Sequence, residues 1–386
     1  MTCDMKKTII SRIFITALVA LCAMGADATS VQQLLASLKA RVAPDARTAV
    51  WDVSVTEQDQ VPVIVGTVGT IAQRELISRE LSDSSVTIFD NRVVALEQTV
   101  PMQKRNAMVK LSVATLRTQP KHSAEIATQA VMGTPVKVLC EDGEWLRVQL
   151  PDTYIAYVPE SSVAYMSTAE MSQWKVAKRF IVTDYCSRLV AQPGGDETVT
   201  DLVLGCILQY VSEKGKWLCL ATPDGREGWV EKTVVAEFSK WAQQDLNIAL
   251  IESTARRMMG SGYLWGGTST KVTDCSGLMK VSYFASGIIL QRDASQQALT
   301  GEKIPDWHSA VRGDLLFFGN SRTGRVTHVG MYLADGLYIH CSGQVKINSL
   351  DPESPLYLYS PLSISRIQGQ VGTTGITAVR NHAWYF

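Results

Sequence analysis

The sequence predicts an α+β protein in which a small N-terminal α+β region and two small β-barrels precede a larger C-terminal α+β domain. Three observations carry this prediction: an internal repeat, a cysteine at the start of an amphipathic helix, and two histidines on strand-like segments downstream of it. The length of 386 residues is sufficient for two to four domains. With 37 basic and 37 acidic side chains, the composition favours no nucleic-acid partner.

The first 28 residues are typical of a secretory signal peptide. Basic side chains precede an apolar run over residues 13–23, and small residues follow at positions 26 and 28. This pattern predicts cleavage after Ala28 and an exported protein. An uncleaved anchor is the alternative, but the run is shorter than the roughly 20 residues that a membrane-spanning helix needs. Lipid attachment at Cys22 is a further alternative, which the preceding leucine disfavours.

Residues 29–100 are predicted to form the small N-terminal α+β region. Apolar residues at helical spacing indicate a helix over 31–42, and valine-rich runs at 49–55 and 61–65 indicate strands. Residues 71–81 indicate a second helix. Nothing in this region is typical of a reaction centre, so we expect it to serve in packing or spacing.

The middle of the chain contains an internal repeat with a constant offset of 72 residues. The recurring residues are Gly133, Gly143, Trp145, Pro151, Asp152, Val158 and Val163, which recur as Gly205, Gly215, Trp217, Pro223, Asp224, Val230 and Val235. Each copy has short β-rich runs broken by turn residues, with a tryptophan able to fill a small core. The repeat predicts two small β-barrels, over residues 101–168 and 169–238.

A cysteine is the candidate nucleophile of the C-terminal domain, which is predicted to span residues 239–386. Cys275 follows a glycine-containing loop, and the apolar residues after it share one face of a predicted helix. Backbone N–H groups at a helix start stabilise a thiolate, so this position predicts a lowered thiol pKa. The alternative is a buried structural cysteine, because free cysteines are among the most buried residues.

Two histidines, His328 and His340, lie on strand-like segments joined by a turn signal at 334–336. A three-residue loop would pair Leu333 with Leu337 and place both imidazoles on one face of the sheet. A two-residue loop would place them on opposite faces. The same-face arrangement would let one imidazole activate a thiol and the other orient the first.

These residues resemble the NlpC/P60 family of papain-like cysteine peptidases, which cut peptidoglycan stem peptides. The resemblance covers about residues 240–386, and its motifs are Tyr263-Leu264-Trp265-Gly266-Gly267, Asp274-Cys275-Ser276-Gly277, Arg292-Asp293-Ala294-Ser295-Gln296-Gln297, Gly313-Asp314-Leu315-Leu316-Phe317-Phe318, Thr327-His328-Val329-Gly330 and Tyr338-Ile339-His340. The resemblance implies a papain-like catalytic domain in which Cys275 is the nucleophile, His328 the general base and His340 the orienting third member.

The two repeats resemble bacterial SH3 domains, which precede the catalytic domain in this family and help to bind the substrate. The first copy is similar to that of γ-D-glutamyl-L-diamino acid endopeptidases. The resemblance implies that Glu125 and Tyr154 bind the free amine of an N-terminal L-alanine, although single surface residues of these types are more often merely solvated. Asp293 would hold the ammonium or cap a helix. The complete set of predicted substrate-binding residues is Glu125, Tyr154, Tyr263, Trp265, Asp274, Ser276 and Asp293, with Tyr263 also a candidate oxyanion donor.

The implied reaction is hydrolysis of the bond between the γ-carboxyl of D-glutamate and a diamino acid, diaminopimelate or lysine. We expect peptidoglycan-derived peptides as partners, a monomer, no cofactor and no metal, no stable membrane insertion after signal cleavage, and a periplasmic or extracellular location. The alternatives are a catalytically silent peptidoglycan-binding adaptor, a hydrolase of intact peptidoglycan, and a zinc site. The twelve-residue spacing of the histidines disfavours zinc.

Removal of the signal leaves six cysteines in an exported chain: Cys140, Cys186, Cys206, Cys219, Cys275 and Cys341. This number is too small to replace a hydrophobic core in a chain of this size. Cys206 and Cys219 flank a predicted hairpin, so either a disulfide between them or two buried thiols fits the sequence. Strand alternation turns Cys341 away from the face of His340, which predicts a core position.

Overall fold

The computed structural model describes residues 28–59, 61–84, 86 and 88–386. The predicted signal peptide therefore lies outside the described residues, apart from Ala28. The chain divides after Thr99 into two compact units. Within the described ranges, no helix is both long and apolar enough to span a membrane.

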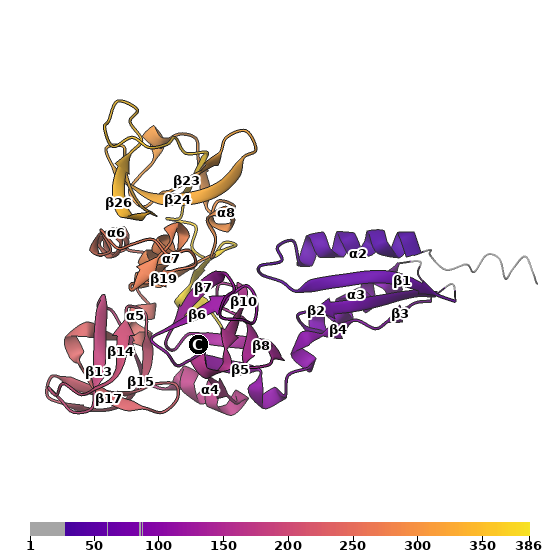
Figure 1. The fold of residues 1–386 in the computed structure, drawn as a ribbon, viewed down its shortest axis with the longest axis horizontal. Helices are drawn as coiled ribbons and strands as arrows, with labels where there is room; N and C mark the ends of the chain where they lie inside the picture. The colour runs from indigo at the N-terminus through magenta and orange to yellow at the C-terminus, as the bar shows by residue number, and fades with distance from the viewer. Residues whose placement is uncertain (1–27, 60, 85, 87) are drawn as a thin grey trace, which may run out of the picture. The chain divides into compact units, whose positions relative to one another are not determined.

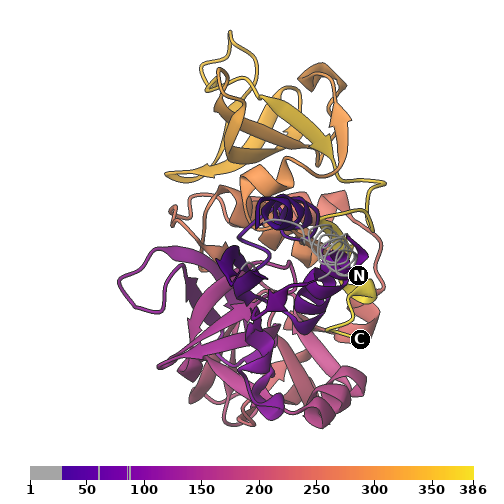
Figure 2. The same ribbon diagram turned by 90° about the vertical axis from the view of Figure 1, so that its right-hand side faces the viewer.

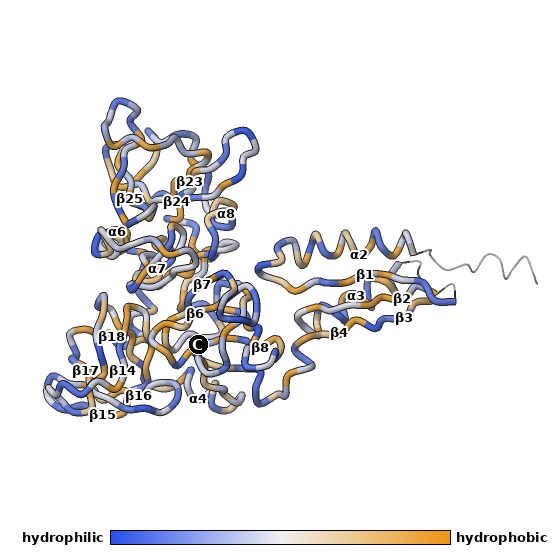
Figure 3. The backbone as a smooth tube through the Cα atoms, viewed as in Figure 1, coloured by the Kyte–Doolittle hydropathy of each residue, from blue (hydrophilic) through white to orange (hydrophobic). Residues whose placement is uncertain are grey.

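The N-terminal unit packs two helices against a small sheet. Its elements are α2 (Ala28–Val42), β1 (Trp51–Gln58), β2 (Val61–Val68), α3 (Ile71–Asp83), β3 (Asp90–Asn91) and β4 (Val94–Ala95). β1 pairs with β2 in antiparallel fashion, whereas β3 and β4 are parallel to β2. Hydrophobic and hydrophilic segments alternate along α2 (Figure 3), because only one of its faces, with Val31 and Leu38, is buried in the core.

The two repeats form two seven-stranded sheets with the same strand order. The first contains β5 (Asn106–Val109), β6 (Val113–Arg117), β7 (Ile126–Val131), β8 (Pro135–Asp142), β9 (Trp145–Gln149), β10 (Ile155–Pro159) and β11 (Val163–Met166). After the short helix α4 (Thr168–Val176), the second contains β12 (Arg179–Val182), β13 (Cys186–Val190), β14 (Thr198–Val203), β15 (Ile207–Lys214), β16 (Trp217–Ala221), β17 (Glu227–Glu231) and β18 (Val235–Glu237). The order β11-β5-β8-β9-β10-β6-β7 in the first sheet corresponds to β18-β12-β15-β16-β17-β13-β14 in the second. The two repeats therefore share a strand topology as well as a sequence pattern.

The C-terminal part consists of a six-stranded antiparallel sheet and a layer of helices. The helices are α5 (Phe238–Ala242), α6 (Ile248–Arg257), α7 (Cys275–Ala285) and α8 (Ala294–Gln297). The sheet, in the order β22-β27-β23-β24-β25-β26, contains β22 (Glu302–Ile304), β23 (Leu315–Asn320), β24 (Arg325–Ala334), β25 (Leu337–Ser342), β26 (Gln344–Ser349) and β27 (Ser363–Arg366). Two short pairs, β19 (Thr268–Ser269) with β20 (Val272–Thr273) and β21 (Ile288–Leu290) with β28 (Ile376–Ala378), complete it.

Helix α7 is the central element of the second unit. Figures 1 and 2 both show the helical layer between the six-stranded sheet on one side and the two barrels on the other. Leu278, Met279 and Tyr283 of α7 are fully buried in the core that also holds Val329 and Ile339 of the sheet. The opposite side of the helix faces the barrels, so α7 connects the sheet to the first repeat.

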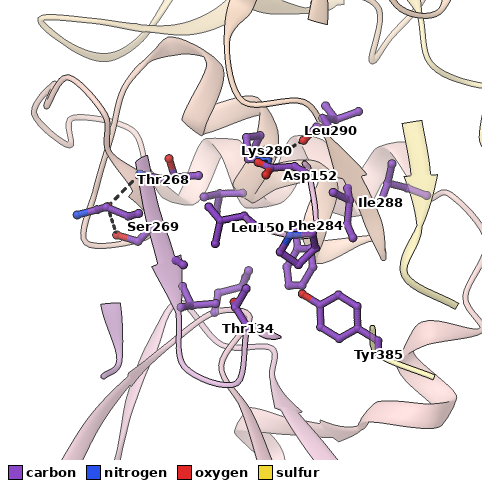
Figure 4. Close-up of a pocket in the computed structure, with 17 residues that line it drawn as sticks. Thr134, Leu150, Asp152, Thr268, Ser269, Lys280, Phe284, Ile288, Leu290 and Tyr385 are labelled. Atoms are coloured by element: carbon purple, nitrogen blue, oxygen red, sulfur yellow. Dashed lines mark hydrogen bonds and ion pairs between the residues drawn. The ribbon is translucent and has the colours of Figure 1, made fainter. Parts of the chain in front are cut away.

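The contact between the first barrel and α7 contains an ion pair beside an apolar cavity, with side chains that are 13% and 5% exposed (Figure 4). The Lys280 ammonium lies 2.5 Å from a carboxylate oxygen of Asp152 and donates to the carbonyl of Leu290 at 2.6 Å. Phe284 and Tyr385 are among the residues that line the cavity, and none of the predicted catalytic residues does. This ion pair fixes the turn at Asp152, two residues before Tyr154, to the helix that begins with Cys275.

Candidate active site

Cys275 is the first residue of α7, and the residues on either side of it explain why the helix begins there. Asp274 is the N-cap, and its carboxylate accepts a hydrogen bond from the backbone N–H of Gly277 at 2.7 Å. A Cβ at position 277 would lie 2.0 Å from the carbonyl oxygen of Gly267, so only glycine allows the loop to approach the helix this closely. The cysteine itself is 6% exposed.

The expected lowering of the Cys275 pKa is wrong for the structure. Burial, together with the Asp274 carboxylate, raises the pKa of this thiol to about 11. The backbone N–H groups of Ser276 and Val329 act in the opposite direction, as does Arg292, but they do not outweigh desolvation. The raised pKa favours a neutral thiol at pH 7.

The hairpin that carries the histidines differs from the predicted one, although the histidines do share a face. Gly330 pairs with His340, as the three-residue loop required, but Ala334 rather than Leu333 pairs with Leu337. The turn consists of only two residues, with φ values of 52° and 75°, and a bulge in β24 supplies the additional residue. The bulge reverses the alternation once, which returns both imidazoles to the same side of the sheet.

The two histidines belong to a continuous chain of hydrogen bonds. His328 Nε2 lies 2.7 Å from His340 Nδ1, and His340 Nε2 lies 2.8 Å from Asn348 Oδ1. Burial and the neighbouring His340 lower the pKa of His328 to about 4, and burial also lowers the pKa of His340. Both imidazoles are therefore neutral at pH 7, and Nδ1 of His328 is the ring nitrogen left outside this chain.

A buried arginine links the nucleophile loop to the first barrel. Arg292 is 2% exposed, and its guanidinium donates to both carboxylate oxygens of Asp274, at 2.5 and 3.2 Å. It also donates to the hydroxyls of Ser276, at 2.8 Å, and of Thr128 on β7, at 3.0 Å. Since Asp274 Oδ2 additionally accepts from Gly266 N, both carboxylate oxygens and the Ser276 hydroxyl have protein partners. This arrangement favours a positioning role for Asp274 and Ser276 over direct contact with a substrate.

The remaining predicted substrate-binding residues lie where the first barrel meets the nucleophile loop. The hydroxyl of Tyr154 donates to Asp293 Oδ2 at 3.2 Å, and Asp293 also caps α8 through a capping box with Gln296. The two roles predicted for Asp293, capping a helix and holding a substrate ammonium, are therefore compatible. Glu125 is exposed. The next residue, Ile126, packs against Gly266, and a Cβ at position 266 would lie 2.4 Å from the Ile126 side chain.

Tyr263 and Trp265 precede Cys275 in the same loop. Tyr263 is half-buried, and burial together with Cys275 and Asp274 raises the pKa of its hydroxyl, so it remains a proton donor. Trp265 is 57% exposed. Its ring is thus available for contact with a ligand.

Sequence reasoning assigned no role to Asn348, to Arg292 or to the Lys280–Asp152 pair. Asn348 could have been found from the tight turn at Gly343, which pairs His340 with Lys346 and places position 348 two residues further along the same face. The first-barrel partners of the other groups, Thr128 for Arg292 and Asp152 for Lys280, lie more than 100 residues away along the chain, and no local pattern indicates them.

All six cysteines in the described part of the chain are free thiols. Cys206 is buried, and its sulfur contacts the backbone of Val203 and Ser112, whereas Cys219 lies on β16. Cys341 is fully buried in the core beneath the sheet, as strand alternation predicted.

Two segments of the chain match known protein families. Residues 260–360 match the NlpC/P60 family, and residues 116–163 match the bacterial dipeptidyl-peptidase SH3 domain. The fold agrees with that of a crystal structure of an NlpC/P60 family protein from Bacillus cereus, with a TM-score of 0.60 and 24% identity over 68% of this chain and 99% of that one.

Three relatives with named activities each align with more than half of this chain. Dipeptidyl-peptidase 6 of Lysinibacillus sphaericus is 28% identical over 272 residues, which cover 65% of this chain and 94% of the relative. The γ-D-glutamyl-L-lysine dipeptidyl-peptidase of Bacillus subtilis is 28% identical over 218 residues, 56% of this chain and 72% of the relative. The predicted resemblance and fold class are thus confirmed: residues 260–360 resemble the NlpC/P60 family of cysteine peptidases, and residues 116–163 resemble the bacterial dipeptidyl-peptidase SH3 domain.

Proposed function

We propose that the protein hydrolyses the bond between the γ-carboxyl of D-glutamate and a diamino acid in peptidoglycan stem peptides that begin with a free L-alanine. The observation that carries the proposal is the meeting of Tyr154, from the first barrel, with Asp293, from the catalytic domain. The relatives named γ-D-glutamyl-L-lysine dipeptidyl-peptidase support the choice of bond.

In this proposal, the free amine sets the register of the substrate. An ammonium beside Asp293 and Tyr154 would be paired with the Asp293 carboxylate, and Glu125 is proposed as a second partner, whereas Arg292 is already neutralised by Asp274. An acylated amine cannot supply that charge, so a bound substrate would cover the Asp293 carboxylate without adding a compensating positive charge. Glycan-linked stems, in which the alanine nitrogen is acylated, would therefore be poor substrates.

The chemistry begins with the neutral pair of Cys275 and His328. His328 takes the thiol proton while the sulfur attacks the γ-carbonyl carbon, and the carbonyl electron pair moves to oxygen. The Tyr263 hydroxyl and backbone N–H groups near the helix start are the candidate donors to that oxyanion. When the tetrahedral intermediate collapses, the departing amine takes the proton from His328 and a thioester remains.

Water completes the reaction. His328 accepts a proton from water as its oxygen attacks the thioester, and the same proton then returns to the sulfur as the thiol leaves. The products are L-Ala-D-Glu and the diamino acid portion. A product set of small soluble peptides fits turnover or recycling of wall fragments in the periplasm, and we propose export through residues 1–28 as the route to that location.

The test is mass spectrometry of the purified protein incubated with L-Ala-γ-D-Glu-diaminopimelate, its L-lysine counterpart and the N-acetylated form of each. We expect fast release of L-Ala-D-Glu from the free tripeptides, much slower cleavage of the N-acetylated forms, and no cleavage by the Cys275→Ala variant. Equal cleavage of acetylated and free peptides would contradict the amine requirement. Binding without cleavage of any peptide would contradict the enzymatic proposal and support the adaptor alternative.

A further inference from the structure

The hydrogen-bond chain behind the histidines ends at a backbone carbonyl, and that end point determines where every proton in the chain lies. The amide of Asn348 is 2.7 Å from the carbonyl oxygen of Leu356 through its Nδ2 atom. A carbonyl oxygen can only accept, so the group facing it must be the –NH₂. The carbonyl is itself held by the backbone N–H of Ser349 at 2.9 Å, and its position therefore does not depend on Asn348.

The orientation of Asn348 then fixes the protonation of His340. With –NH₂ directed to Leu356, the atom 2.8 Å from His340 Nε2 is the amide oxygen, which accepts only. His340 must carry its proton on Nε2. A neutral imidazole has one N–H, so Nδ1 of His340 is an acceptor.

The same reasoning applies to the next ring. His328 Nε2 is 2.7 Å from the bare Nδ1 of His340, so His328 must carry its proton on Nε2. Nδ1 of His328 is then unprotonated. A base at that atom is what the buried, neutral thiol of Cys275 requires.

We propose that Asn348 is a positioning residue that fixes both histidines as Nε2–H tautomers and so keeps Nδ1 of His328 available to the Cys275 thiol. Without the amide oxygen, His340 could place its proton on Nδ1 and donate to His328 Nε2. That would move the proton of His328 to Nδ1, where it would block transfer from the thiol. Packing of Tyr338 against His340, with ring centroids 4.9 Å apart, limits rotation of the ring but does not select a tautomer.

The first test needs no substrate, so it is independent of the proposed function. The chain has only five histidines, and their ring nitrogens can be resolved by long-range ¹H–¹⁵N NMR of the uniformly labelled protein. At pH 7.5 we expect His328 and His340 as Nε2–H tautomers. In the Asn348→Leu variant we expect a proton on Nδ1 of either ring. A wild-type Nδ1–H on either ring, or no tautomer change in Asn348→Leu, would overturn the proposal.

The second test rests on the proposed function and compares two variants of one position. Asn348→Asp keeps an acceptor toward His340 but loses the donor to Leu356, whereas Asn348→Leu loses both. We expect Asn348→Leu to lower kcat on the free tripeptide by about 10- to 1,000-fold with little change in KM. Asn348→Asp should retain kcat within about tenfold, because the tautomer is kept.

A carboxylate at position 348 should also move the acidic limb of kcat/KM to higher pH, since it stabilises protonated imidazoles. Lys346 opposes and Asp274 supports protonation of His328, and both are present in every variant. Asn320→Leu, at an exposed turn on β23, is the matched control and should leave kcat unchanged. Equal loss of kcat in Asn348→Asp and Asn348→Leu would assign the effect to the Leu356 contact and overturn the tautomer proposal.

Discussion

The hydroxyl of Tyr154 lies 3.2 Å from Asp293 Oδ2, although the two residues are 139 positions apart and belong to different domains. The first barrel is thus part of the surface that faces the nucleophile loop and not an independent attachment. The contact places a hydrogen-bond donor and a carboxylate together at the point where the proposed substrate amine would bind.

Replacing Tyr154 by phenylalanine tests this contact. We expect kcat/KM for the free tripeptide to fall about 10- to 100-fold, because a hydrogen bond to a charged group contributes roughly 1.5–3 kcal/mol. The slow cleavage of the N-acetylated tripeptide should not change, so the preference for the free amine narrows. Tyr157→Phe, on the adjoining strand β10, is the control. A parallel loss on both peptides would indicate a general folding effect.

Stability should fall in acid because His328 is buried in the neutral form. Burial and His340 lower its pKa from 6.5 to about 4. A depressed pKa contributes stability that is present above the unfolded value and is lost as the pH falls from about 6.5 toward 4, by up to about 3 kcal/mol. Urea unfolding at pH 7.0 and 4.5 measures this difference. In the His328→Gln variant, the free energy of unfolding should fall less between pH 7.0 and 4.5. An equal fall in the variant and the wild type would show that His328 is not the cause of the acid destabilisation.

The Lys280–Asp152 pair should behave as a buried interaction between domains. Each single variant, Lys280→Met or Asp152→Asn, should lower the free energy of unfolding by about 3–5 kcal/mol, because a charge is left buried without its partner. The double variant should lose less than the sum of the two. The exposed pair Lys216–Glu231 is the control, where Lys216→Met should cost less than about 1 kcal/mol. Additive losses at 280 and 152 would show that the two side chains are not coupled.

Gly277→Ala should reverse the usual effect of this substitution in a helix. Alanine normally stabilises a helix interior by about 1 kcal/mol relative to glycine. Here the new Cβ would lie 2.0 Å from the carbonyl oxygen of Gly267, so we expect a loss of at least about 2 kcal/mol and of activity. Denaturant unfolding checks this, with Ser253→Ala on the exposed face of α6 expected to be near neutral. A stabilised, active Gly277→Ala enzyme would show that the loop can move away.

Much of the fold could be predicted because its signals are local. The 72-residue offset predicted two equivalent barrels, and strands β7 to β10 recur as β14 to β17 at that offset. The residues around Cys275 predicted the start of α7, and the spacing of turn and strand residues predicted neighbouring strands for His328 and His340. The domain boundaries and the roles of the predicted site residues stay predictions.

The arrangement of the site depended on contacts that no local pattern contains. The bulge in β24 lies between Tyr332 and Ala334, and it decided that a two-residue turn still leaves the imidazoles on one face. The pKa of Cys275 was predicted from the helix start alone, but desolvation by the surrounding core and the charge of Asp274 raise it instead.

The sequence by itself determined which groups can do chemistry, because the thiol, the imidazoles and the glycines that admit them are identified by residue type and spacing. Only the tertiary structure decided which partners those groups have. Arg292 hydrogen-bonds to Thr128, and Tyr154 hydrogen-bonds to Asp293. Asn348 hydrogen-bonds to both His340 and the Leu356 carbonyl. The physical reason is that hydrogen bonding and burial depend on distance in space, and folding brings together residues whose separation along the chain carries no signal.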